Sequence, residues 1–268
     1  MNAPFKLPGF SVLFALVFFF ASCDDGKVNF FSVDEDISLG QEITEEILNN
    51  PQDYPVLDRN QHPGAYAYME RMRDEILASS DIRHKNRFDW NVYIIDQDVF
   101  NAFALPGGNT FYYSGLIKFL DDEASLAGVM AHEIAHSDRR HSTNRLTKIY
   151  GFQIMASLLL GNNPGLVQQI VADLALTTTA LSFSRDDEFE ADEYAVRYLY
   201  PTQTDSRGVA YFFEKIDAEP SPGWMVYFST HPPNDARIEA IYEKHQELGG
   251  KEGNLFQERY QAFKNSLP

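Results

Sequence analysis

The stretch Val129-Met130-Ala131-His132-Glu133-Ile134-Ala135-His136 decides how the rest of the chain is interpreted. Its flanks are apolar, which is typical of a buried helix. His132 and His136 are four residues apart, so both imidazoles leave the same face of a helix, one turn apart. Two neutral imidazoles in this arrangement can bind one Zn²⁺. The stretch therefore predicts a buried helix that carries a metal site.

Glu133 stands directly beside His132 and is therefore a poor third ligand for the same metal. It can instead reach a water molecule at the metal and take its proton. A metal ion with a neighbouring carboxylate is the arrangement used in metal-assisted hydrolysis. A solvated helix face with two histidines would have charged neighbours, which this stretch lacks.

A third protein ligand must come from elsewhere in the chain. A histidine six residues beyond His136 would complete a different class of zinc site, but Ser142 stands there. In a later acidic segment, Glu188 and Asp192 share a helix face, whereas Glu190 points about 200° away from Glu188. We expect Glu188 to be the third ligand. Asp192, one turn on, is placed to accept the second N–H of a ligating histidine.

Composition limits the possible classes of function. The chain has 268 residues and is 44% hydrophobic and 14% aromatic, so it can bury the core of one large domain or two small ones. The net charge of −17 argues against binding to nucleic acid or to anionic lipid by general electrostatics. The acidity is typical of a soluble surface.

The N-terminus indicates export and a lipid anchor. Lys6 precedes an apolar run from Phe10 to Ala21, which is too short to span a bilayer and matches a secretory signal. Cys23, the single cysteine, follows it in a context similar to a bacterial lipoprotein cleavage box. We expect a signal peptide at 1–22, lipidation of Cys23, a tether at 23–33 and a catalytic domain at 34–268. The alternative is a buried N-terminal helix with an incidental cysteine.

Periodicity and turn residues predict the remaining elements. They are helices over 34–48 and 64–78, a strand over 88–95, two strands over 101–105 and 109–113, a metal helix ending near 141, and helices over 205–217 and 234–248. Asp34 or Asp36 is expected to cap the first helix. Two apolar runs, 149–160 and 166–183, predict a helical hairpin that is buried or touches the bilayer surface.

The two strands around Pro106-Gly107-Gly108 predict a hairpin directly before the metal helix. We expect its outer strand to border the cleft, where a peptide adds to a sheet edge through backbone hydrogen bonds. That strand would contain Asn109, Thr110, Phe111 and Tyr112. The alternative is a hairpin that only completes the sheet.

Histidines outside the motif receive separate predictions. His231 precedes Pro232-Pro233 and so sits on rigid backbone. His141 lies about 180° around an ideal helix from His132, which predicts a structural hydrogen-bonding role. Surface positions are expected for His62, His84 and His245, and solvated or acid-paired positions for Arg139 and Arg140.

At this point the sequence resembles the zinc metallopeptidases that include HtpX, the CAAX prenyl proteases, the mitochondrial Oma-type proteases and the BepA-like proteases. The matching pieces occur in the family's order: residues 101–108, His132 to His136 with Arg140-His141, residues 184–192, and Thr230 to Pro233 with Arg237. Unlike parts of that family, the chain has no four-helix membrane bundle and no helical-repeat domain in its sequence pattern.

The resemblance implies a gluzincin-type fold and endopeptidase activity. It implies one Zn²⁺ held by His132, His136 and Glu188, with Glu133 as general base. His231 would bind the developing oxyanion or fill the fourth zinc position, and Arg237 is the other candidate oxyanion donor.

These expectations combine into one prediction. It is an α+β, mainly helical zincin-like domain with a small antiparallel sheet beside the metal helix, anchored through Cys23 in a bacterial cell envelope, at the outer membrane, on its periplasmic or surface face. Its partners would be polypeptide substrates, either misfolded or specific envelope proteins, and unidentified envelope proteins. Two rivals remain: a chaperone-like binding lipoprotein that retains the zinc fold, and a structural lipoprotein without zinc.

Overall fold

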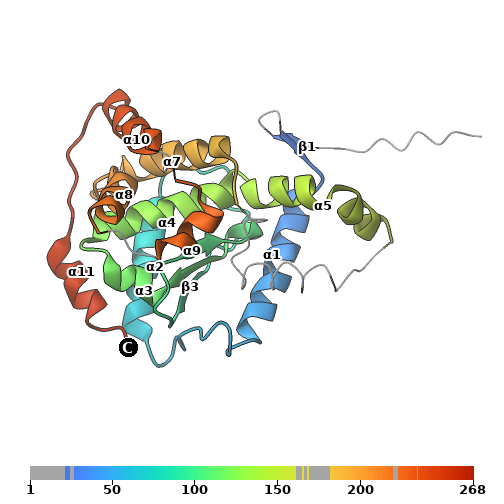
Figure 1. Cartoon of the computed structure of the whole chain (residues 1–268), viewed down its shortest axis with the longest axis horizontal. Coiled ribbons are helices and arrows are strands. Elements are labelled where there is room, and N and C mark those ends of the chain that lie inside the picture. The colour runs from blue at the N-terminus through green and yellow to red at the C-terminus, as the bar shows by residue number, and fades with distance from the viewer. Residues whose placement is uncertain are drawn as a thin grey trace, which may run out of the picture.

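The computed structural model describes residues 22–24, 27–160, 165, 168, 182–219, 223–233 and 235–268. Helices surround a long helix, α4 (Glu123–Asp138), and a small sheet lies beside it (Figure 1). The predicted α+β, mainly helical class is confirmed.

Before α4 the elements are β1 (Ser22–Asp24), β2 (Lys27–Asn29), α1 (Val33–Leu48), α2 (Pro63–Leu77), β3 (Val92–Ile95), β4 (Ala102–Ala104), the 3₁₀ turn η1 (Pro106–Gly108), β5 (Thr110–Tyr113) and α3 (Ser114–Phe119). After α4 follow α5 (His141–Leu160), α7 (Arg185–Leu199), α8 (Gly208–Ala218), α9 (Trp224–Thr230), α10 (Ala236–Glu247) and α11 (Gln257–Lys264).

Helix α4 is buried along its whole length, including its polar residues. The Asp122 carboxylate caps its start by accepting the Ser125 N–H at 2.8 Å. Helices α7 and α8 pack along it (Figure 1). The crossing with α8 requires glycine, because a Cβ on Gly128 would lie 2.3 Å from the Val209 nitrogen. This close packing fixes the helix that carries the predicted metal ligands.

The sheet corrects one prediction. Its strand order is β3-β5-β4, with β3 and β5 parallel and β4 and β5 antiparallel, so the sheet is mixed rather than antiparallel. The hairpin of β4 and β5 is confirmed. The chain leaves a gap between β3 and β4, and β5 inserts into it, parallel to β3. The first of these strands is also shorter than predicted, because Trp90, just before it, has φ +52°.

The turn η1 joins the hairpin to α1. Gly107 has φ +78°, in the left-handed region that favours glycine. A Cβ there would lie 2.8 Å from the Ile37 Cα. The glycine therefore allows the turn to contact the backbone of α1, which brings the N-terminal helix next to the sheet.

The ends of two helices differ from the prediction. Ser32, not Asp34 or Asp36, caps α1, and Asp36 lies inside the helix, where it pairs with the buried Arg140. Helix α4 ends at Asp138 instead of near His141, because Arg140 has φ +58° and redirects the chain into α5. Of the two positions predicted for Arg140, solvated or paired with an acid, the structure shows the second, and the pair is buried.

The other predicted helices agree with the structure within a few residues: α1, α2, α8 and α10. Of the predicted helical hairpin, the first run lies in α5 and most of the second lies outside the described residues. Among the described residues, no helix has both the length and the apolarity needed to cross a bilayer.

The surface position predicted for His245 is wrong. Its side chain is fully buried, and its Nδ1 lies 2.9 Å from the Ser206 hydroxyl.

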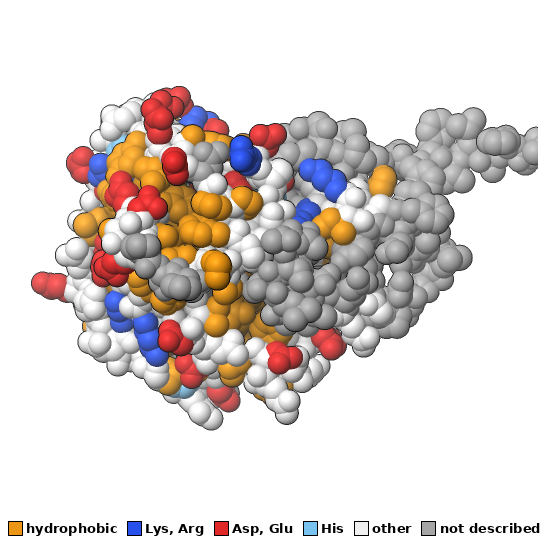
Figure 2. Space-filling view, viewed as in Figure 1, with side chains coloured by type: hydrophobic (Ala, Val, Ile, Leu, Met, Phe, Trp, Pro, Cys, Tyr) orange, Lys and Arg blue, Asp and Glu red, His pale blue; other side chains and the backbone are white. Residues whose placement is uncertain are grey.

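The described surface is consistent with the acidic composition. On the face shown in Figure 2, Asp and Glu side chains lie around the edge, while apolar side chains gather toward the middle. Met225 of α9 is the most exposed large apolar residue in the described part of the chain, at 70%.

Candidate metal centre

Helix α4 brings two imidazoles together as its spacing predicts. His132 and His136 are fully buried, and their Nε2 atoms lie 2.9 Å apart. Burial, followed by the neighbouring His132, holds the pKa of His136 well below its ordinary value. His136 is therefore neutral, which is the form that binds a metal.

Helix α7 supplies the third predicted ligand. Its start is fixed by a capping box between Ser184 and Asp187. One residue later, the Glu188 Oε1 lies 3.4 Å from the His136 Nε2, and its Oε2 lies 3.6 Å from the His132 Nε2. Glu190 points elsewhere and pairs with Arg139 at 2.7 Å. The structure thus brings Glu188, and not Glu190, to the two histidines.

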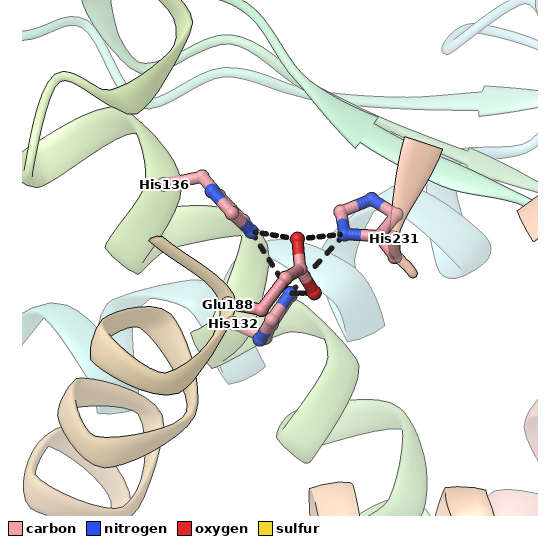
Figure 3. A group of neighbouring side chains, drawn as sticks. All are labelled: His132, His136, Glu188 and His231. Carbon is pink, nitrogen blue, oxygen red and sulfur yellow. Dashed lines mark hydrogen bonds and ion pairs between the residues drawn. The ribbon is translucent and has the colours of Figure 1, made fainter. Parts of the chain in front are cut away.

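A fourth side chain joins this group from the end of α9. The Nδ1 of His231 lies 3.3 Å from the His132 Nε2 and 3.2 Å from the Glu188 Oε1. The imidazole is buried and stacks on Tyr227, with centroids 4.6 Å apart and planes 18° apart. Figure 3 shows the four side chains pointing at one another.

The donor set fits a small cation with tetrahedral geometry. Five of the six donor pairs among these residues are 2.9 to 3.6 Å apart, and all four ligand atoms lie within 4.8 Å of one another. Metal–ligand bonds of about 2.0–2.1 Å give tetrahedral edges of about 3.3 Å. Three imidazole nitrogens and a carboxylate are ligands that Zn²⁺ and related transition metals accept.

Arg237 holds the carboxylates of α7 behind the metal ligands. Its Nε and Nη2 bind both oxygens of Asp192 at 2.6 and 2.8 Å, and its Nη1 lies 2.7 Å from the Glu188 Oε2. Burial alone would raise the pKa of both carboxyls, but Arg237 reverses this and lowers both overall, that of Glu188 strongly. The guanidinium of Arg237 is thus engaged by the two carboxylates of α7, and its role as an oxyanion donor stays a prediction.

Asp192 lies where the sequence predicts. Its Oδ1 is 2.8 Å from the His132 Nδ1, the nitrogen that does not face the other donors. A carboxylate at this position fixes which nitrogen of the ring carries the proton. Helix α7 therefore contributes both a donor and the group that orients another donor.

Glu133 is a fully buried carboxylate beside the converging donors. The His231 Nε2 lies 3.5 Å from its Oε1, and the backbone of Ala104 hydrogen-bonds to it. Burial raises the pKa of Glu133, and the opposing effect of His231 and His132 is smaller. The carboxyl group is thus easier to protonate than an exposed glutamate.

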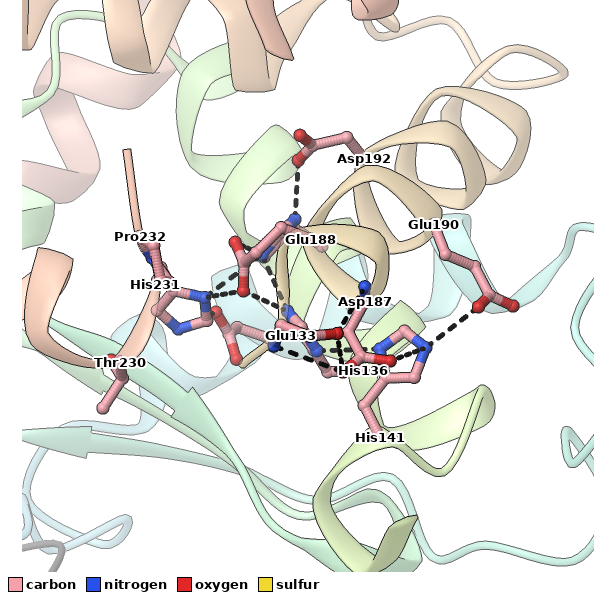
Figure 4. Close-up of polar contacts among 12 residues, drawn as sticks. Glu133, His136, His141, Asp187, Glu188, Glu190, Asp192, Thr230, His231 and Pro232 are labelled. Atoms are coloured by element: carbon pink, nitrogen blue, oxygen red, sulfur yellow. Dashed lines mark hydrogen bonds and ion pairs between the residues drawn. The ribbon is translucent and has the colours of Figure 1, made fainter. Parts of the chain in front are cut away.

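His141 has a hydrogen-bonding role, as the sequence predicts, but its place beside a metal ligand was missed. Its Nδ1 lies 2.9 Å from the His136 Nδ1, and its Nε2 lies 3.4 Å from Glu190 (Figure 4). It thus connects His136 to α7, as Asp192 connects His132. The ideal-helix argument placed it on the far side of α4, and no sequence signal located the break at Arg140 that returns it to the site.

The predicted substrate strand is wrong. Phe111 and Tyr112 belong to β5, the central strand, whose backbone is paired on both sides. Thr110 belongs to the same strand, and Asn109 precedes it with its side chain bonded to Thr44 at 2.8 Å. The edge strand beside α4 is β4. Of the two hairpin strands, β4 and not β5 is the edge strand, because β3 pairs with the other side of β5.

Cys23 belongs to β1, where its backbone pairs with Val28 of β2. Residues 1–21, nearly all of the predicted signal peptide, lie outside the described residues. Its predicted lipidation stays a prediction.

Comparisons with known proteins agree with this geometry. The family model described as peptidase family M48 matches residues 63–245. The chain is 30% identical to the mitochondrial metalloendopeptidase OMA1 of Schizosaccharomyces pombe over 81% of its own length and 63% of the relative. It is 29% identical to the beta-barrel assembly-enhancing protease of Escherichia coli K12 over 59% of its length and 35% of the relative. The chain thus spans only a third to under two thirds of these relatives. The match over most of the chain shows that it belongs to peptidase family M48.

Proposed function

We propose that this chain is a zinc-dependent endopeptidase that hydrolyses peptide bonds in polypeptides. The single observation that carries the proposal is the fully buried carboxylate of Glu133 beside the converging donors His132, His136 and Glu188. A carboxylate kept buried in this state costs stability and is useful where a proton must be taken up during a reaction.

A zinc ion bound there would polarise the scissile carbonyl and acidify an attacking water. Glu133 accepts the proton of that water as general base and returns it to the leaving amine as general acid. Its raised pKa suits both halves of this transfer, since burial brings it nearer to the working pH. Asp192 keeps the His132 ring oriented, and Arg237 keeps Asp192 and Glu188 ionised.

The substrate backbone is proposed to bind along β4. The N–H of Tyr113 donates to Asn101 at 3.1 Å and that of Leu105 to Asn109 at 2.8 Å. Such pairs alternate in an antiparallel ladder, so the backbone groups of Ala102 and Ala104 point away from β5. A peptide that adds here needs no particular sequence for its main-chain hydrogen bonds.

His231 is proposed to regulate access to the site. Its Nδ1 completes the group of donors at near-tetrahedral distances, which supports a role as fourth zinc ligand in a resting enzyme. It must move aside before substrate can enter. The alternative is that its imidazole stabilises the developing oxyanion, since burial alone would lower its pKa but Glu188 and Glu133 raise it overall.

The cellular role is proposed as quality control in a bacterial envelope, with Cys23 as lipid anchor. The name of the Escherichia coli relative supports an envelope role, whereas the name of the yeast relative refers to mitochondria. The rival function is a lipoprotein that only binds client polypeptides. The buried Glu133 beside the donors argues against it, because binding alone does not need a base.

Digestion of unfolded casein tests the proposal. Glu133→Gln should retain zinc and lose about 10²–10⁴-fold in rate, because it removes the base but no ligand. Glu258→Gln is the matched control, since Glu258 is exposed on α11. Equal cleavage by wild type and Glu133→Gln would contradict the proposal, and zinc-loaded wild type that binds casein without cutting it would favour the rival.

A further inference from the structure

We infer that an apolar pocket beside the metal centre binds a substrate side chain next to the scissile bond and selects Leu or Met there. The inference rests on the proposed function and names the substrate feature that the same site recognises. Three segments far apart in the sequence form the pocket: α1 through Ile43, β4 and the residues after it, and α5 through Arg145 and Leu146. Phe183, Thr230 and His231 complete it.

The pocket is continuous with the metal centre. His231 lines it and contacts His132 and Glu188. Phe183 stacks on the His136 ring, with centroids 3.9 Å apart and planes 23° apart, and its N–H donates to the Thr230 carbonyl at 2.9 Å. Figure 4 shows Thr230 and His231 on the side of the site where the sheet lies. A side chain in this pocket therefore belongs to a residue whose backbone lies at the metal.

Small residues at the strand edge leave the space open. Ala104 and Ser142 both line the pocket and lie side by side, because the Ser142 hydroxyl donates to the Ala104 carbonyl at 3.5 Å. Ser142 stands at the position where another class of zinc site has its third histidine. Because Glu188 takes that ligand role here, the position is free to line the pocket.

The size and chemistry of the pocket define the side chain. Its volume is about 60 Å³, and a water molecule needs about 10–15 Å³ by the same measure, so about four to six heavy atoms fit. That is the size of a Leu or Met side chain. The walls formed by Ile43, Phe103 and Leu146 are apolar. Apolar walls also disfavour a Lys or Arg side chain, whose charged group would lose its hydration there.

Matched peptides that differ at one residue beside the cut test this inference. We expect wild type to cleave the Leu or Met peptide at least about tenfold faster than the Ala peptide, because each methylene group in an apolar pocket changes kcat/KM by about 10- to 200-fold. The Lys peptide should be cleaved more slowly than the Ala peptide. Leu146→Phe and Ile43→Phe, which fill the pocket, should reduce the Leu/Ala ratio at least about tenfold while Ala-peptide cleavage continues.

Ile149→Phe is the control, since Ile149 lies on the same helix but is 43% exposed and outside the pocket. It should keep the wild-type ratio of Leu-peptide to Ala-peptide cleavage.

Equal cleavage of the Leu and Ala peptides by wild type, or an unchanged ratio in both Leu146→Phe and Ile43→Phe, would overturn the inference without affecting the proposed peptidase activity. Fluorescence anisotropy with zinc-loaded Glu133→Gln separates the two proposals. If wild type does not cleave but Glu133→Gln still binds the Leu peptide more tightly, the pocket stands and the peptidase function falls. If there is neither cleavage nor preferential binding, both fall.

Discussion

Replacing Arg237 by Met should destabilise the protein through the two carboxylates that Arg237 neutralises. The guanidinium is 1% exposed and binds Asp192 and Glu188 at 2.6 to 2.8 Å. Removing one member of a buried ion pair costs about 3–5 kcal/mol, because the remaining charge is left without compensation. A domain is typically stable by about 5–15 kcal/mol, so the loss is a large part of the total.

The dependence of this loss on pH follows from the direction of the shifts. In the wild type the folded-state pKa of Asp192 and of Glu188 lies below the ordinary value, so the pair contributes stability above that value and loses it as pH falls through the folded-state pKa. Without Arg237, burial raises both pKa values, and the variant carries a penalty at neutral pH that protonation relieves. The stability difference should therefore be larger near pH 7 than near about pH 5.

Urea unfolding of metal-free protein at both pH values measures the difference. Arg237→Lys is the companion variant. It retains the positive charge but not the planar guanidinium that binds both Asp192 oxygens, so its loss of folding stability should be smaller than that of Arg237→Met. It also keeps the experiment informative if Arg237→Met does not fold. A loss below about 1 kcal/mol in Arg237→Met, or a loss that grows as pH falls, would refute the reasoning.

The remaining predictions concern the metal, the fourth donor and the anchor. Glu188→Ala should lose zinc by metal analysis, and zinc content equal to wild type would show that His132, His136 and His231 hold the metal without it. His231→Ala should raise basal casein cleavage if the imidazole fills the resting site, whereas a fall of about 10²–10³-fold with zinc retained would assign it to the oxyanion. Cys23→Ser should abolish acyl labelling and release the protein from membranes, and full retention of the unlabelled variant would instead assign the membrane contact to the two apolar runs of 149–160 and 166–183.

The local geometry of the site follows from the sequence. His132, Glu133 and His136 lie on one helix, where the direction of each side chain depends only on its distance along the chain. For the same reason, residue spacing alone assigns Glu188 and Asp192 to one face of a helix and Glu190 to another. The hairpin is predictable because Pro106-Gly107-Gly108 is a local turn signal.

Tertiary structure alone decided the rest, because strand order and helix ends depend on contacts between distant residues. β5 is the central strand because β3 pairs with the side that β4 leaves free. The edge strand beside α4 is therefore β4 and not the predicted β5. Arg140 adopts a left-handed conformation while pairing with Asp36, more than a hundred residues earlier, and this break brings His141 to His136. His231, which follows α9, reaches the metal ligands through the packing of that helix on the core. No spacing within the chain encodes such distances, since they are set by the burial of side chains that meet only in the folded state.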